Sequence, residues 1–257
     1  MPSTFLTAEW RSLVMLNYEV DRAILAPLVP RGVELDLWEG GALVSMVGFL
    51  FLDCRVLGVA IPFHRDFEEV NLRFYVLRKV DGVWRRGVVF VREIVPRFAI
   101  AAVARLFYNE PYLALPMRHE APAHGGEFSY AWKFGGRWNS LGARTRGEPA
   151  PIAAGSAEEF IFEHYWGCTR QRDGGTMEYQ VEHPAWRVWQ TENSSLDCDA
   201  GALYGAAFTG PLRGKPHSAF VAEGSPVSVR RGGHVAAGEC GANASKWERP
   251  QPRSGSK

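Results

Sequence analysis

The chain is built from short runs in which apolar and polar residues alternate, and this two-residue period is typical of β-strands. Residues 68–76, EEVNLRFYV, alternate most clearly. The apolar side chains of this run share one face of the predicted strand: Val70, Leu72, Phe74 and Val76. The polar and amphipathic side chains share the other face: Glu69, Asn71, Arg73 and Tyr75. The run therefore predicts a strand with one polar face and one apolar face.

Glycine-containing turns separate further pairs of such runs and predict hairpins. The predicted pairs are 33–38 with 42–53, 67–78 with 83–93, 127–134 with 137–146, and 165–171 with 176–183. Helices are fewer. We expect one over 21–29 with Asp21 as its cap, one over 98–107, and one that begins at the capping box formed by Ser156 and Glu159.

Many short strands joined by tight turns predict an α+β, mainly β fold, in which an antiparallel β-barrel carries a few short flanking helices. No shift in composition marks a second domain, so residues 1–231 are predicted to form a single domain. Residues 232–257 are rich in Gly, Ser, Pro and Ala without apolar periodicity, and we predict a disordered tail there. A β-barrel can enclose a small ligand, so an interior pocket is the expected site.

The composition and net charge of the chain indicate which classes of binding partner are not expected. The 257 residues carry a formal charge of +1 and are 46% hydrophobic, which excludes global disorder and gives no electrostatic reason to expect nucleic acid or an anionic membrane. The longest apolar run, residues 42–54, is shorter than the roughly 20 residues of a spanning helix. The N-terminus has no export signal, so a cytoplasmic protein is expected.

The scattered cysteines predict buried free thiols: Cys54, Cys168, Cys198 and Cys240.

The polar face of residues 68–76 is the best candidate site. Same-face neighbours on an extended strand are about 6.6 Å apart, so Glu69 and Arg73, two such steps apart, cannot pair directly. Each needs another partner, such as Arg92 or Glu93 on a neighbouring strand, or a ligand carboxylate held by Arg73. A face in contact with solvent would show the same alternation. The interleaved Asn and Tyr favour a polar interior instead.

His164 and His183 occur in the similar contexts EHYW and EHPAW. Either could act as a general base or metal ligand, although a histidine flanked by aromatic residues more often packs and hydrogen-bonds. A zinc site with Glu163 or Glu182 lacks a third ligand at suitable spacing, so no metal is predicted. Neither a G-x-S-x-G element nor a phosphate-binding glycine loop is present in the sequence. Nothing else in the sequence calls for a cofactor.

The segment EVNLRFYV resembles the E-x-N-x-R-x-Y-V signature of the uncharacterised YqjF-like family. WRSLVMLNYEVDRAILAPLVP, ARLFYNEPY, FIFEHYWG and VEHPAWRVW are similar to other landmarks of that family in the same order. The resemblance spans residues 10–229 and implies the fold of acetoacetate decarboxylase. That enzyme uses a Schiff-base lysine a few residues after an Arg-Glu-apolar stretch similar to 92–94, but no lysine occurs between Lys79 and Lys133. Since a Schiff base needs a primary amine, the resemblance implies a fold without that reaction.

The sequence thus predicts a pocket for a small organic acid or similar molecule, with an organic anion as the expected ligand. Catalysis is left undecided, and the alternative is a non-catalytic ligand-binding or structural oligomeric module in which the same polar groups form a satisfied network. A homo-oligomer is compatible with either hypothesis. Arg97 is a candidate second anion contact. The predicted ligand-binding residues are Glu69, Asn71, Arg73, Tyr75, Arg97, His164 and His183.

Overall fold

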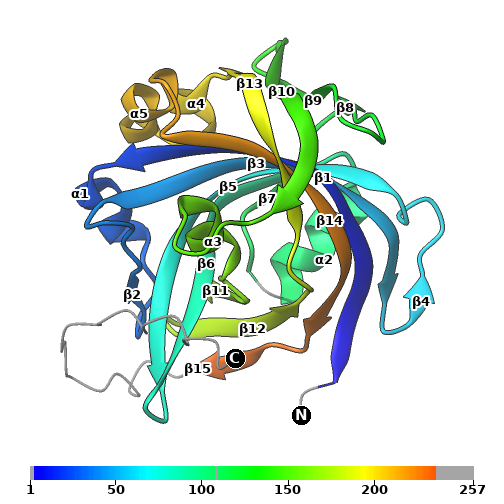
Figure 1. Ribbon diagram of the computed structural model, residues 1–257. Helices are drawn as coiled ribbons and strands as arrows, with labels where there is room; N and C mark the ends of the chain where they lie inside the picture. The colour runs from blue at the N-terminus through cyan, green and yellow to red at the C-terminus, as the bar shows by residue number, and fades with distance from the viewer. Residues whose placement is uncertain (1–2, 108, 236–257) are drawn as a thin grey trace, which may run out of the picture.

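The computed structural model describes residues 3–107 and 109–235 (Figure 1). Strands dominate, and fifteen are seen in these ranges: β1 Thr4–Val20, β2 Glu34–Leu35, β3 Ala42–Val56, β4 Val59–Ala60, β5 Phe67–Val80, β6 Val83–Val95, β7 Tyr112–Ala114, β8 Met117–Glu120, β9 Glu127–Phe134, β10 Arg137–Pro151, β11 Trp166–Arg170, β12 Thr176–Glu182, β13 Arg187–Asp197, β14 Ser218–Arg230 and β15 Gly233–Val235. The helices are short: α1 Arg22–Leu25, η1 Ala26–Leu28, α2 Phe98–Phe107, α3 Ala157–Phe162, α4 Ala200–Tyr204, η2 Ala206–Phe208 and α5 Thr209–Arg213. None of the described helices is long and apolar enough to cross a membrane.

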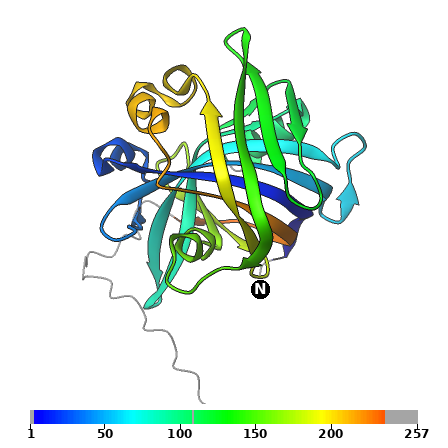
Figure 2. The same ribbon diagram turned by 45° about the horizontal axis from the view of Figure 1, so that its top comes forward.

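The strands form one continuous sheet that returns to itself. Its path runs β12–β11–β6–β5–β3–β1–β14, and β14 pairs again with β12 through Val181↔Val229 and Glu182↔Ser228. Seven strands therefore make a ring, and β13, β10, β9 and β8 extend the sheet from β14 (Figures 1 and 2). The prediction of a wholly antiparallel sheet is wrong in detail, because β6 pairs in parallel with both β11 and β7.

The ring separates two hydrophobic cores because its central strands are buried on both faces. On β5, Val70, Leu72 and Phe74 pack in the core that also includes Leu203 and Leu212 of α4 and α5. The second core lies on the other face of the same strands. It includes Val47, Phe49, Phe51, Tyr75 and Trp186. The alternation read from residues 68–76 is therefore confirmed, although neither face of this strand is left to solvent.

Local turn signals predicted most hairpins correctly. β5 and β6 meet at Asp81 and Gly82, which have positive φ angles of 49° and 81°, and β9 and β10 meet at Gly135 and Gly136 in the same way. The β11–β12 hairpin is also confirmed. The predicted pairing of 33–38 with 42–53 is wrong, because β2 pairs with β5 and only an isolated bridge joins Trp38 to Gly41.

The helix caps follow their sequence signals. Asp21 caps α1 by accepting a hydrogen bond from the backbone N–H of Ala23, and Ser156 caps α3 by accepting one from Glu159. The carboxylate of Glu159 reaches back to the N–H of Gly155 rather than to that of Ser156. The helix predicted over 98–107 is confirmed as α2.

The predicted start of the disordered tail, residue 232, lies too early in the chain, because an ordered strand follows it. Residues 233–235 form β15 and pair with β12, while residues 236–257, including Cys240, lie outside the described residues. Cys54 and Cys168 are buried free thiols, whereas Cys198 is only partly buried.

Candidate functional site

A cavity of about 200 Å³ lies inside the ring, lined by residues from each of its seven strands. One wall is aromatic. Trp10 contacts Phe49, Phe51 and Trp186 with ring centroids 5.4, 5.8 and 6.4 Å apart, and Phe51 stacks on Phe67 at 4.8 Å. Such a wall suits the apolar part of a ligand.

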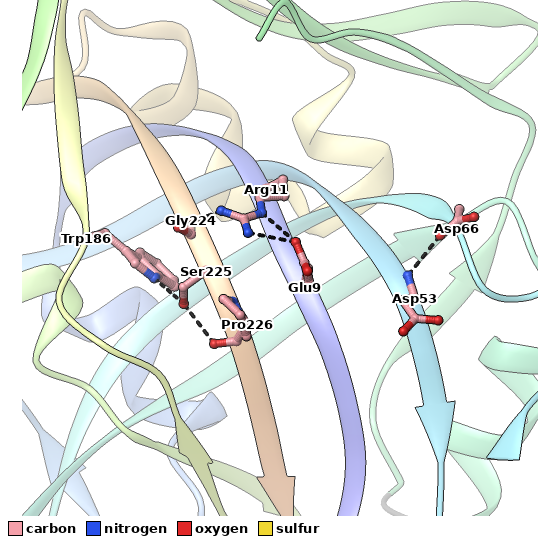
Figure 3. Close-up of polar contacts among 8 residues, drawn as sticks. All are labelled: Glu9, Arg11, Asp53, Asp66, Trp186, Gly224, Ser225 and Pro226. Carbon is pink, nitrogen blue, oxygen red and sulfur yellow. Dashed lines mark hydrogen bonds and ion pairs between the residues drawn. The ribbon is translucent and has the colours of Figure 1, made fainter. Parts of the chain in front are cut away.

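Hydrogen bonds from β14 fix this wall (Figure 3). Trp186 Nε1 donates to Ser225 Oγ at 2.7 Å, and Ser225 Oγ donates to the carbonyl of Pro226 at 2.9 Å. Beside them, Gly224 has a φ of 80° and passes so close to β1 that a Cβ there would lie 2.0 Å from the Trp10 carbonyl oxygen. Only glycine permits this close approach, which brings Trp10 and Trp186 to the same side of the cavity.

The polar side of the cavity follows from strand register. β5 lies between β3 and β6, where Asn71 is paired with Val47 on one side and Glu93 on the other. β7 then pairs with β6 in parallel and places Tyr112 beside Glu93. Paired residues in neighbouring strands point to the same face, so three strands direct polar groups into one space.

Three buried glutamates meet there: Glu69, Glu93 and Glu110. Glu69 accepts hydrogen bonds from Asn71 Nδ2 at 2.9 Å and from the Tyr112 hydroxyl at 3.0 Å. Glu110 Oε1 accepts from the Tyr179 hydroxyl at 2.9 Å and also from Thr169 Oγ1. Glu93 Oε2 and Glu110 Oε2 have no hydrogen-bond partner within the described part of the chain.

Burial and mutual repulsion keep these carboxyls protonated to unusually high pH. Burial raises the pKa of Glu69 to about 7, with the charge of Glu110 adding to the effect and the hydrogen bonds from Asn71 and Tyr112 opposing it. Burial also raises the pKa of Glu110 to about 7, and burial together with the other two glutamates raises the pKa of Glu93 well above its usual range. Because the three carboxyls lie together, ionisation of one opposes ionisation of the others.

Arg73 is the guanidinium that lines this cavity. It is half-buried, its Nε is buried without a hydrogen-bond partner among the described residues, and its charge lowers the pKa of His164 and His183 as a secondary effect after burial. No ion pair with Glu69 is formed, as their spacing predicted. Arg92 forms no ion pair with Glu69 and Glu93 forms none with Arg73 in the described part of the chain, although Arg92 and Glu93 lie on the neighbouring strand as the sequence suggested.

Most predicted site residues come together. Glu69, Asn71, Arg73, His164 and His183 line the cavity. Tyr75 shares their face, but its hydroxyl hydrogen-bonds Ser45 and its ring packs 4.6 Å from that of His164, so it supports the site from behind.

Arg97 is exposed before α2 and is not among the cavity's lining residues, so the structure does not support it as a second anion contact.

Sequence reasoning missed Glu110, Tyr112 and Tyr179. Glu110 and Tyr112 lie in the segment ARLFYNEPY, which the sequence analysis identifies as a family landmark and not as part of the site. A lone glutamate between apolar segments was the available signal. Tyr179 gave none, because only the fold of β11 and β12 brings it to Glu110.

No group of three or more potential metal ligands is found in the described ranges. No lysine of residues 3–107 or 109–235 lines the cavity either. Lys79 lies over the Trp84 ring at the end of the β5–β6 hairpin, and Lys133 is exposed on β9.

Comparison with known proteins identifies relatives over most of the chain. The model of the DUF2071 family, described as an uncharacterized conserved protein, matches residues 7–226. The uncharacterized protein YqjF of Bacillus subtilis (strain 168) is 31% identical over 189 residues, which are 71% of this chain and 74% of that protein.

Solved structures share the fold at low sequence identity. The acetoacetate decarboxylase of Legionella pneumophila is 15% identical with a TM-score of 0.65, covering 91% of this chain and 88% of that one. The enduracididine biosynthesis enzyme MppR, solved with a condensation product of pyruvate and imidazole 4-carboxaldehyde, is 12% identical with a TM-score of 0.65, covering 93% and 92%. An acetoacetate decarboxylase-like enzyme from Sphingomonas wittichii RW1 has a TM-score of 0.60 at 13% identity, covering 91% and 94%.

Proposed function

We propose that this chain, which belongs to the DUF2071 family, binds a small organic acid with an apolar tail inside its strand ring. The observation that carries the proposal is the environment of Arg73. This half-buried side chain lines a cavity that also has an aromatic wall, and its Nε has no hydrogen-bond partner in the described residues. A half-buried guanidinium that forms no ion pair with a carboxylate in the described part of the chain is suited to a ligand carboxylate.

The neighbours support this ligand class. Acetoacetate decarboxylase is named for a keto acid, and MppR was solved with pyruvate. Both proteins share the overall fold of this chain at 12–15% identity, and we propose that this chain binds the same class of ligand.

The glutamate cluster adds a second property to the proposed site. An anion held at Arg73 would raise the pKa of the nearby carboxyls further, and Glu69 and Glu110 already titrate at about 7. Binding of the acid would therefore take up a proton at neutral pH. Carboxyls with a pKa near the working pH are also suited to general acid and base chemistry. Such chemistry would not require a Schiff base.

The alternative of a satisfied structural network fits the structure less well. Several residues that line the one cavity carry buried polar atoms without a hydrogen-bond partner in the described part of the chain: Asn71 Oδ1, Arg73 Nε, Glu93 Oε2, Glu110 Oε2 and His164 Nδ1. Buried polar groups are usually paired. A ligand that supplies the missing partners explains the set more simply than a structural role does.

Thermal stabilisation by a matched pair of probes tests the proposal. We expect 3-phenylpropanoate to raise the melting temperature, while 3-phenylpropanamide, which has the same tail and no charge, leaves it unchanged. Arg73→Met should stay folded and lose at least tenfold in affinity for the acid. Arg92→Met is the control, since Arg92 is half-buried in the same sheet and does not line the cavity. Equal stabilisation by acid and amide, or an unchanged affinity in Arg73→Met, would sink the proposal.

A further inference from the structure

Asp36, Arg86 and His164 form a hydrogen-bonded group beside the cavity. Arg86 Nε donates to Asp36 Oδ2 at 2.7 Å, and His164 Nε2 lies 3.0 Å from the same oxygen. The side chains of Asp36 and His164 are each 1% exposed. Asp36 follows β2, and His164 lies between α3 and β11, so the group ties two connecting segments to β6.

The proton positions in this group follow from its chemistry. Burial alone would raise the pKa of Asp36, but the hydrogen bonds and charges of His164 and Arg86 hold it below its usual value, so the group is a carboxylate. A carboxylate only accepts hydrogen bonds, and His164 Nε2 must therefore carry the hydrogen. Burial, opposed by the hydrogen bond to Asp36, lowers the pKa of His164 to about 4. The ring is neutral at pH 7, and Nδ1 holds a lone pair.

Nothing in the described residues donates to that lone pair. His164 Nδ1 is buried without a hydrogen-bond partner, and the ring lies against Tyr75 and Phe160, with centroid separations of 4.6 and 5.1 Å. Aromatic rings supply no hydrogen bond to Nδ1 here, although His164 lines the cavity. Arg73 Cζ lies 5.8 Å from the centroid of the Tyr75 ring, and the His164 ring packs against that same ring at 4.6 Å, so a cation and an acceptor lie near one another on the cavity lining.

We propose that His164 Nδ1 accepts a hydrogen bond from a ligand hydroxyl while Arg73 holds the ligand carboxylate, so that the cavity selects hydroxy acids over their deoxy analogues. This inference rests on the proposed organic-acid function and adds the second functional group of the ligand. A buried acceptor left unpaired by the deoxy analogue penalises that analogue. Asp36 is a positioning residue, because it acts by fixing the tautomer of His164.

His183 provides the internal comparison. It also lines the cavity, but its Nδ1 lies 3.0 Å from the carbonyl oxygen of Pro184. Because a carbonyl only accepts, this nitrogen is a donor already in use. The ring stacks on Trp186 with centroids 4.2 Å apart and is only partly buried. His183 therefore lines the cavity, but no carboxylate like that of Asp36 fixes its tautomer in the described part of the chain.

The first test needs no ligand. Nitrogen-15 NMR of the histidine rings should show His164 neutral, with hydrogen on Nε2, from pH 5.5 to pH 8. Asp36→Asn, whose amide can donate to Nε2, should shift the signal toward the tautomer with hydrogen on Nδ1. A charged His164 ring at pH 6, or hydrogen on Nδ1 in the wild type, would overturn the inference. An unchanged tautomer in Asp36→Asn would remove the positioning role of Asp36.

The second test uses 2-hydroxy-3-phenylpropanoate, as both enantiomers, and 3-phenylpropanoate in calorimetric titrations. We expect one enantiomer of the hydroxy acid to bind the wild type at least tenfold more tightly than the deoxy acid. His164→Phe should lose this preference while it still binds the deoxy acid, and the control variant His119→Phe should keep it, because His119 is exposed on β8 and does not line the cavity. Should His164→Phe not fold, the wild-type ratio and the NMR result decide.

The possible failures are distinguishable. Binding of the deoxy acid without any preference for the hydroxyl, or a preference that survives in His164→Phe, overturns only the inference about His164. If neither acid binds the wild type, the organic-acid function itself fails, and the hydroxyl selectivity fails with it.

Discussion

At the scale of single residues, the site depends on charges placed where water cannot solvate them. Glu69 is 2% exposed, and the two hydrogen bonds that it accepts offset only part of the cost of burying its charge. The same burial that makes Glu69 expensive as an anion makes it available as a proton donor near neutral pH.

Glu69→Gln should remove the contribution of Glu69 to the pH dependence of stability. The pKa of Glu69 is about 7 in the folded protein and near 4.5 when unperturbed, so the folded state holds the proton more tightly and loses stability as the pH rises toward and past 7. Relative to the wild type, the variant should gain on the order of 1–3 kcal/mol between pH 5 and pH 8.5, at about 1.4 kcal/mol per pKa unit.

Urea unfolding at both pH values measures this difference. Glu192→Gln is the control, because Glu192 is exposed on β13 and should show no such gain. A Glu69→Gln variant whose stability runs parallel to that of the wild type across this range would contradict the assigned environment of Glu69.

At the scale of elements, one glycine lets two strands bring the site together. A Cβ at Gly167 of β11 would lie 2.2 Å from Cζ of Tyr179 on the paired strand β12. The missing side chain leaves room for the Tyr179 ring, whose hydroxyl then reaches Glu110 at 2.9 Å. Gly167 thus positions a hydrogen bond to the glutamate cluster without touching it.

Gly167→Ala should therefore displace Tyr179 and destabilise the protein by about 1–3 kcal/mol through overpacking. Gly233→Ala is the matched strand substitution, since a Cβ there meets nothing within 4 Å, and it should be nearly neutral. Thermal unfolding of both variants provides the measurement. Equal melting temperatures for the two would show that Tyr179 does not need the space above Gly167.

The elements also show what local sequence can predict. Asp81-Gly82 and Gly135-Gly136 fix their hairpins because the positive φ angles are a property of the turn residues themselves. The pairing of β2 with β5 was missed because it joins residues some forty positions apart, where no turn specifies the partner. Glu69 and Arg73 were found from strand alternation, whereas Glu110 and Tyr179 are brought in by loops and pairings that periodicity does not describe.

At the scale of the whole molecule, the ring closes through few contacts. Only two residue pairs join β12 to β14, and Glu182 on β12 reinforces them by accepting from Ser228 and pairing with Arg230 on β14. β15 continues β14 along the same edge of β12 and adds a contact of 2.9 Å between His234 Nε2 and Asp173 Oδ2. β12 therefore depends on the C-terminal part of the chain.

Two truncations separate this contribution from that of the remaining chain. Deleting 236–257, a stretch rich in Gly, Ser and Pro, should change the melting temperature by less than about 2 °C, whereas deleting 232–257 also removes β15 and should lower it by several degrees. Calorimetric scans of the two truncated proteins give the comparison. A large loss already in the shorter deletion would show that residues beyond 235 contribute to the fold.

The most direct test of the central claim is the proton uptake that accompanies ligand binding. Titration of the wild type with 3-phenylpropanoate at pH 7, in two buffers of different ionisation enthalpy, reports the protons taken up per bound acid. An anion at Arg73 beside carboxyls with pKa values of about 7 should take up a measurable fraction of one proton, and its affinity should fall by up to about tenfold per pH unit above pH 7. Binding with no buffer dependence and no loss of affinity at higher pH would contradict the placement of the acid at this cluster.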